Sequence, residues 1–175
     1  GTYTIDASHT LAGFVVKHLM ISKVRGSFSD VSGTIVIAED PVQSSVEVDI
    51  DVASVHTRDE GRDGHLRSPD FFDAEQFPKI TFRSTSVAHV DGDRWTVVGD
   101  LTIKDVTQSV TLDTTFEGAS PKPEALGGGY SIGFSASAKV NREAFGLTWN
   151  APLEGGGVLV GKDVTLEIET EAFEA

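Results

Sequence analysis

The chain has 175 residues, no cysteine, and 27 acidic against 14 basic side chains, which gives a formal net charge of -13. Its length suits one domain over residues 1–175, and the missing thiols exclude disulfide frameworks and cysteine-based zinc sites. Because the charge repels phosphate and no apolar run reaches the ~18 residues of a transmembrane helix, we expect no nucleic-acid partner and no membrane-embedded chain, and anionic membrane surfaces are disfavoured.

Alternation of apolar and polar residues is the dominant pattern along the chain. Between Val46 and Val52, for example, apolar residues alternate with acids, which is typical of a strand with one buried face. In chain order the pattern predicts about eight strands, near residues 13–18, 33–38, 46–52, 79–90, 95–103, 110–116, 130–136 and 164–168. Turn signals separate these runs, and their spacing favours an antiparallel meander.

The segment from Thr57 to Phe77 breaks this alternation. Thr57 and Glu60 have the spacing of a capping box, and Ser68 followed by proline has the pattern of a second helix start. One or two short helices are therefore predicted here, ended by Pro78. The apolar side of the segment is expected to cover one end of a barrel, and it is formed by Phe71, Phe72 and Phe77.

A sheet of about eight strands must cover its apolar face, either by closing on itself or by packing on a second sheet. Composition alone leaves that choice open. If the sheet closes, the inward-facing set is predicted to include Phe14, Val16, Phe28, Phe82, Leu101, Phe116, Ile132, Phe134 and Val164. Small residues on the same faces, such as Thr114 and Ala136, leave volume between these walls. An eight-stranded barrel is either filled by side chains or holds one small ligand.

Four blocks of sequence, in order along the chain, resemble the YceI family. They are the run from Tyr3 to Phe28, His65–Phe82, Gly99–Thr107 and Arg142–Leu147. The resemblance implies an all-β fold, a lipocalin-like antiparallel eight-stranded β-barrel with a helical segment near one end. It also implies an elongated cavity that holds polyisoprenoids, isoprenoid quinones or fatty acid derivatives. The family is not known for one shared catalytic activity, so the resemblance favours binding over catalysis.

On this resemblance, the barrel is expected to bind a long-chain apolar lipid for transport, storage or protection. The predicted walls are Phe14, Val16, Phe28, Phe82, Leu101, Ile132 and Phe134, with Phe72 and Phe77 closing one end. His18 and Arg25 are the predicted head-group contacts, because imidazole and guanidinium donate hydrogen bonds to phosphate or carbonyl groups. Two alternatives stay open, a structural or interaction module with a filled barrel and, with less support, a small-molecule enzyme.

Metal, cofactor and catalytic sites are not expected. No short zinc-type spacing occurs among the histidines His9, His18, His56, His65 and His89. The sequence has no G-x-S-x-G elbow, and the glycine runs at 127–129 and 155–157 lack the frame of a phosphate or dinucleotide loop. These runs are predicted to be turns.

Two further expectations concern partners and location. Family members often pair, so a homodimer is an open expectation, although no surface can be identified as an interface from the sequence. The sequence as given shows no leader, which favours a cytoplasmic location. A periplasmic or secreted location after removal of a leader stays open.

Overall fold

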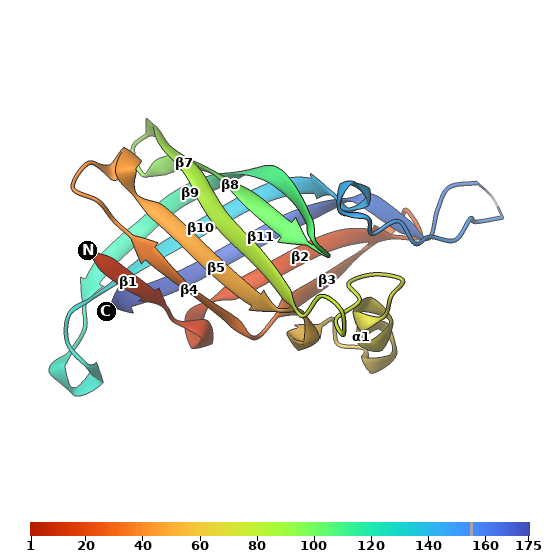
Figure 1. The fold of residues 1–175 in the computed structure, drawn as a ribbon, viewed down its shortest axis with the longest axis horizontal. Coiled ribbons are helices and arrows are strands. Elements are labelled where there is room, and N and C mark those ends of the chain that lie inside the picture. Colours follow the sequence, from red (N-terminus) through yellow and green to blue (C-terminus); the bar gives the residue numbers. More distant parts are fainter. Residues whose placement is uncertain (155) are drawn as a thin grey trace.

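Figure 1 shows the computed structural model of the chain, an elongated barrel in which residues 1–154 and 156–175 are described. Gly155, from the second predicted glycine turn, lies outside the described residues. The strands are β1 (Thr2–Ile5), β2 (Leu11–His18), β3 (Ser22–Phe28), β4 (Val31–Val36), β5 (Ser45–Asp51), β6 (Val55–His56), β7 (Lys79–Asp91), β8 (Arg94–Ile103), β9 (Val106–Pro121), β10 (Tyr130–Asn141) and β11 (Val160–Glu174). The helical elements are α1 (Glu60–Arg67) and the short 3-10 turns η1 (Ala7–His9), η2 (Pro41–Gln43), η3 (Val52–Ser54), η4 (Glu124–Leu126) and η5 (Arg142–Phe145).

Strand pairing closes the sheet on itself. The order is β1-β4-β5-β7-β8-β9-β10-β11, and β1 pairs back onto β11. The remaining strands continue three of these positions: β2 continues that of β1, β3 that of β4, and β6 that of β5. This follows from their pairing, since β2 also pairs with β11, β3 pairs with β2, and β6 pairs with β3. All of these pairings are antiparallel. The predicted all-β, eight-stranded antiparallel barrel with one short helix is confirmed.

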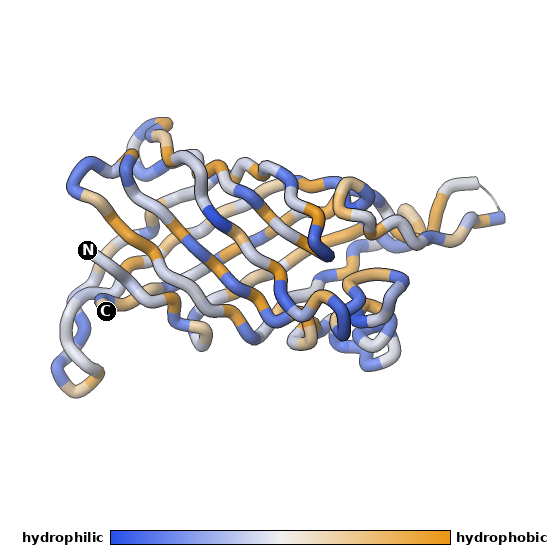
Figure 2. Tube along the Cα trace, in the orientation of Figure 1, coloured by the Kyte–Doolittle hydropathy of each residue, from blue (hydrophilic) through white to orange (hydrophobic). Residues whose placement is uncertain are grey.

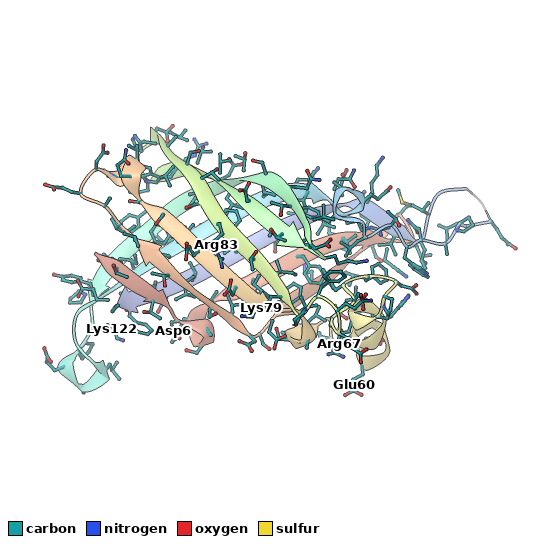
Figure 3. The ribbon with its side chains drawn as sticks, viewed as in Figure 1. Asp6, Glu60, Arg67, Lys79, Arg83 and Lys122 are labelled. Atoms are coloured by element: carbon teal, nitrogen blue, oxygen red, sulfur yellow. The ribbon has the colours of Figure 1, made fainter. Side chains whose placement is uncertain are left out.

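The alternation of residues decides which side chains face the interior. Figure 2 shows hydrophilic and hydrophobic positions alternating along the strands. On β5, Val46 and Val48 line the interior, whereas Asp49 lies outside and accepts a hydrogen bond from Arg83 on β7 at 2.8 Å (Figure 3). The acids of the amphipathic strands are thus in water, and the apolar residues face the enclosed space.

The two ends of the barrel differ. The end at which both chain termini lie is called here the termini end, where the backbone N–H of Ala175 donates to the carbonyl of Thr2 at 3.0 Å. The opposite end, called the helix end, carries α1, the hairpin between β2 and β3, and the residues 146–154 and 156–159 (Figure 1). The predicted helical segment near one end is therefore present.

The start of α1 differs from the predicted capping box. Asp59, not Thr57, caps the helix, and its carboxylate accepts the backbone N–H of Arg62 at 2.9 Å. Thr57 is buried and needs acceptors of its own, so its N–H and hydroxyl both donate to Asp63, at 2.8 and 2.6 Å. Ser68 ends α1 rather than starting a second helix, because its N–H donates back to the carbonyl of His65. Residues 69–77 form turns.

No helix in the described part of the chain is both long and apolar enough to cross a bilayer.

Candidate functional site

The barrel encloses a cavity of about 760 Å³. Its lining begins at Tyr3 and Ile37 near the termini end and continues to His65 and Trp149 at the helix end. The walls between these ends are almost entirely apolar side chains contributed by every one of the eight strand positions. This volume lies within the roughly 300–1,000 Å³ that is usual for small-molecule sites. The interior is therefore hollow rather than filled.

Most of the side chains that the sequence analysis assigned to the site lie along this cavity. The predicted ligand contacts that line it are Phe14, Val16, His18, Phe28, Phe72, Phe82, Leu101, Ile132 and Phe134. The other predicted inward residues, Phe116 and Val164, line it as well. Alternation was sufficient to find them, because each strand keeps one face toward the interior over its whole length.

Two of the predicted contacts lie outside the cavity. Arg25 points away from it, because Val24 and Gly26 occupy the inward face of β3 at this level. Its guanidinium pairs with the carboxylate of Glu167 on the outer surface at 3.1 Å. Phe77 is half-buried in the turns that follow α1 and does not reach the lining.

Phe71 takes the end-closing position that was predicted for Phe77. Its ring lies 5.4 Å from the ring of Trp149, and the imidazole of His65 lies 5.0 Å from Phe71 and 4.7 Å from Trp149, centroid to centroid. Phe72 packs edge-on against Phe28 at 5.6 Å. These aromatic contacts join α1, the turns after it and Trp149 at the helix end, so several separate segments contribute to the lining there.

Glycines on the neighbouring strand keep two aromatic rings close to the wall. Phe14 on β2 is paired with Gly26 on β3, and a Cβ atom at Gly26 would overlap the Phe14 ring. Phe82 on β7 lies in the same way against Gly99 on β8. Because the missing side chains leave room for the rings at the wall, less of the ring volume extends into the lumen.

The charges that line the cavity are all basic. Lys17, Arg62 and Arg142 line it together with His18 and His65, all of them at the helix end, and no Asp or Glu of the described residues does so. This contrasts with the net charge of -13 for the whole chain. The ring nitrogens of His18 have no hydrogen-bond partner among the described residues, whereas the Nε2 of His65 is 2.8 Å from the Asp70 carboxylate. His18 thus offers a free hydrogen-bonding group at this end.

Arg142 organises the helix end of the cavity. It is only 6% exposed, and its guanidinium donates to the carbonyls of Leu147, Trp149, Val160 and Gly161 at 2.7–3.2 Å. Burial lowers the pKa of this guanidinium from its usual range. The side chain therefore ties Leu147 and Trp149 to the start of β11. Apart from the family block around Arg142, no pattern in the sequence indicated this role.

A second polar group lies outside the cavity, beside η1. The Nδ1 of His9 is 2.9 Å from the Asp6 carboxylate and 3.9 Å from that of Glu171, with Asp6 marked in Figure 3. The hydrogen bond to Asp6 raises the pKa of His9, and hydrogen bonds from Ser8 and His9 lower the pKa of Asp6. The contacts link the break between β1 and β2 to β11, and spacing along the sequence did not indicate Glu171 as a partner.

Comparison with known proteins identifies the family. The family described as the YceI-like domain matches residues 3–172. The chain belongs to this family. A UPF0312 protein of Staphylococcus aureus (strain USA300) is 40% identical to this YceI-like chain over 173 residues, which is 97% of the chain and 95% of that protein.

Solved structures have the same YceI-like barrel. A YceI protein of Campylobacter jejuni matches with a TM-score of 0.76 and 33% identity, over 91% of this chain and 90% of that one. A polyisoprenoid binding domain from Saccharophagus degradans matches with a TM-score of 0.69 and 15% identity, over 99% of this chain and 98% of that one. The second likeness is one of fold alone.

Proposed function

We propose that the protein binds a long-chain apolar lipid, with a polyisoprenoid or an isoprenoid quinone favoured, in the interior of its barrel. The observation that carries this proposal is the apolar cavity of about 760 Å³, which reaches from one end of the barrel to the other. The polyisoprenoid binding domain from Saccharophagus degradans has the same fold and supports this class of ligand.

The apolar lining of the cavity supports occupancy by a ligand. The central walls offer few polar partners, so water that enters the cavity must form its hydrogen bonds mostly with other waters. An apolar chain fills the same space and needs no hydrogen-bond partners on the walls.

The expected gain from an apolar chain is sufficient for useful affinity. Burying one methylene group contributes roughly 0.8 kcal/mol, so about ten groups contribute roughly 8 kcal/mol. Ordering a flexible chain takes back several kcal/mol. Micromolar affinity corresponds to about 8 kcal/mol net, so it requires a chain with clearly more than ten buried groups. Each added group changes the free energy of binding by a small and similar amount, so chains of neighbouring lengths are only weakly discriminated.

The head group is expected at the helix end. His18 and the indole N–H of Trp149 are cavity-lining donors there that have no internal hydrogen bond in the described residues, and no carboxylate of those residues lines the cavity. Lys17 follows on the opposite face of β2, close to the same end. Such donors favour a ligand that ends in a hydrogen-bond acceptor, such as a quinone carbonyl, an amide or a phosphate. We place the apolar tail toward the termini end, along Phe116 and Phe134.

A binding role fits this lining better than catalysis. Hydrolysis by paired carboxylates needs two acids in the site, and no acid of the described residues lines this cavity. The alternative of a module with a filled barrel is disfavoured by the volume of the interior. Transport, storage and protection of the lipid are all compatible with the proposal.

Native mass spectrometry of the purified protein, followed by organic extraction, tests the proposal. We expect either a bound lipid at one per chain or stoichiometric uptake of added menaquinone or a prenyl alcohol. The variant His18→Phe keeps the apolar tail contacts and is expected to weaken quinone binding more than binding of a headless hydrocarbon. A folded protein that neither carries nor takes up any of these lipids would contradict the proposal.

A further inference from the structure

We propose that the tip of the β2–β3 hairpin, formed by Leu19, Met20 and Ile21, docks the protein on a lipid bilayer so that the helix end of the cavity faces the membrane. The docking itself is independent of the cargo in the barrel. The orientation of the cavity toward the membrane rests on the function proposed above.

The tip exposes three consecutive large apolar side chains. Ile21 is 84% exposed, Met20 49% and Leu19 37%. Single exposed apolar residues are common on proteins, but a contiguous run at the end of a projecting element is a feature of surfaces that contact another apolar phase. Here the hairpin lies at the helix end of the long axis, beside the loop between η5 and β11, some described residues of which project further (Figure 1).

The backbone conformation of the tip disfavours these bulky side chains, so they do not stabilise the fold. The Ile21 N–H closes a β-turn on the His18 carbonyl at 3.1 Å, and its central residues Leu19 and Met20 have φ values of 55° and 63°. This left-handed conformation favours Asn and Gly, because a branched or bulky side chain is strained there. A turn selected for stability would carry Asn-Gly at these positions. The apolar residues therefore have a role other than stabilising the turn.

The hairpin itself carries only basic charges, in contrast to the acidic chain as a whole. No acid occurs between Asp6 and Asp30, although the whole chain has 27 acids. Lys17 and Lys23 are direct cross-strand partners just behind the tip. Two like charges in this arrangement repel each other, and an anionic surface relieves that repulsion. An apolar tip with lysines directly behind it complements the headgroup and upper acyl regions of an anionic bilayer.

The tip is also connected to the cavity. The Leu19 N–H donates to the Leu159 carbonyl at 2.8 Å, and the Met20 side chain lies beside Gly157. Leu159 lines the cavity, as do Lys17 and His18 at the base of the hairpin. A lipid that leaves a bilayer at the tip thus meets apolar atoms of the segment 156–159 next, and then the proposed head-group donors.

The test is co-sedimentation of the full chain with vesicles of phosphatidylcholine, with and without phosphatidylglycerol. The informative variant is Leu19→Asn/Met20→Gly, which keeps the positive φ values and removes two of the three apolar side chains of the tip. Its binding to the phosphatidylglycerol vesicles is expected to fall by at least about tenfold, because two large apolar side chains no longer enter the interface. Its melting temperature is expected to stay the same or to rise.

Matched controls distinguish the effect of the tip residues from a general effect of removing exposed apolar or basic side chains. Leu126 is 67% exposed at the termini end, and Leu126→Ser removes a comparable apolar group there without loss of vesicle binding. Lys23→Gln is expected to weaken binding to phosphatidylglycerol vesicles while leaving the weaker binding to phosphatidylcholine unchanged.

Three results would overturn the proposal. They are a wild-type protein that binds neither vesicle, equal binding by the wild type and Leu19→Asn/Met20→Gly, and a self-association that this variant abolishes without any effect on vesicles. Lipid retention by the variant, measured by native mass spectrometry, is expected to match the wild type. Loss of retention in both proteins with vesicle binding intact would contradict the proposed function and not the docking.

Discussion

Phe116 on β9 and Phe134 on β10 are cross-strand partners whose ring centroids lie 5.4 Å apart in the wall of the cavity. Replacing Phe134 with Asp places a carboxylate on this wall, and burying an unpaired charge beside an apolar chain is strongly unfavourable. We expect Phe134→Asp to abolish lipid retention in native mass spectrometry. Leu126→Asp introduces the same charge at an exposed position and is expected to retain the lipid, as is Phe134→Leu. Retention by a folded Phe134→Asp protein would remove this residue from the site.

The contact between Phe14 and Gly26 predicts how the cavity volume can be reduced. In Gly26→Ala the new methyl group overlaps the ring, and its three nearest atoms all belong to that ring, so we expect the ring to turn into the lumen. Affinity for a long-chain lipid is expected to fall roughly tenfold, or about 1.4 kcal/mol. Gly133→Ala is the matched control, since the nearest atom to its Cβ is 3.7 Å away.

A second substitution checks this reasoning about the Phe14 ring. Removing the ring in Gly26→Ala/Phe14→Ala is expected to restore uptake, as measured by titration with a fluorescent lipid. If the double variant binds as weakly as Gly26→Ala alone, the ring is not the cause of the lost affinity.

Arg142 is predicted to stabilise the helix end as a unit. Lysine keeps the positive charge but cannot reach four carbonyls in fixed directions, so Arg142→Lys leaves buried acceptors without donors. The free energy of unfolding, measured in urea, is expected to fall by roughly 2–4 kcal/mol. Arg94→Lys changes an exposed pair with Asp91 and is expected to have almost no effect. Hydrogen exchange in the segment 146–154 should rise only in Arg142→Lys.

The pair of Asp6 and His9 predicts a pH dependence. The pKa of His9 is raised above its usual 6.5. Its contribution to the stability of the folded protein is therefore complete below pH 6.5 and is lost as the pH rises through the raised pKa. The pKa of Asp6 is lowered below its usual 3.8. Its contribution to the stability of the folded protein is therefore present above pH 3.8 and is lost as the pH falls through the lowered pKa. The interaction is therefore strongest between these two limits.

The measurement is an NMR titration of the His9 imidazole. In Asp6→Asn the pKa of His9 is expected to fall toward its usual value, and in Glu171→Gln it is expected to fall by less, since Asp6 is the larger cause. An unchanged titration in Asp6→Asn would mean that the observed contact does not persist in solution.

Much of the barrel was predictable because its strands keep a strict period of two. The inward set on β5 and β10 followed directly from alternation, and the number of strand positions followed from the number of alternating runs. The strand β3 was not predicted, because between Ser22 and Phe28 its inward face carries Val24 and the small residue Gly26. The need for a glycine at position 26 follows from the Phe14 ring, which lies against it from the neighbouring strand.

The errors at the site came from contacts that span separate segments. Arg25 was assigned to the cavity from its residue type, and only the pairing of β2 with β3 shows that it faces outward. The exchange of Phe71 for Phe77 has a similar origin, because Trp149 and the turns after α1 meet only in the folded chain. The helix start at Asp59 was missed because the burial of Thr57 could not be read from a local motif.

Both termini leave the barrel at the end opposite to α1 and the β2–β3 hairpin, with Tyr3 and Glu174 as direct strand partners. A linker attached at either terminus would therefore suspend the barrel with its basic, aromatic-lined end pointing away from the point of attachment. The protein can be immobilised or labelled there in a single orientation, which leaves the proposed lipid entrance free for kinetic measurements on supported bilayers.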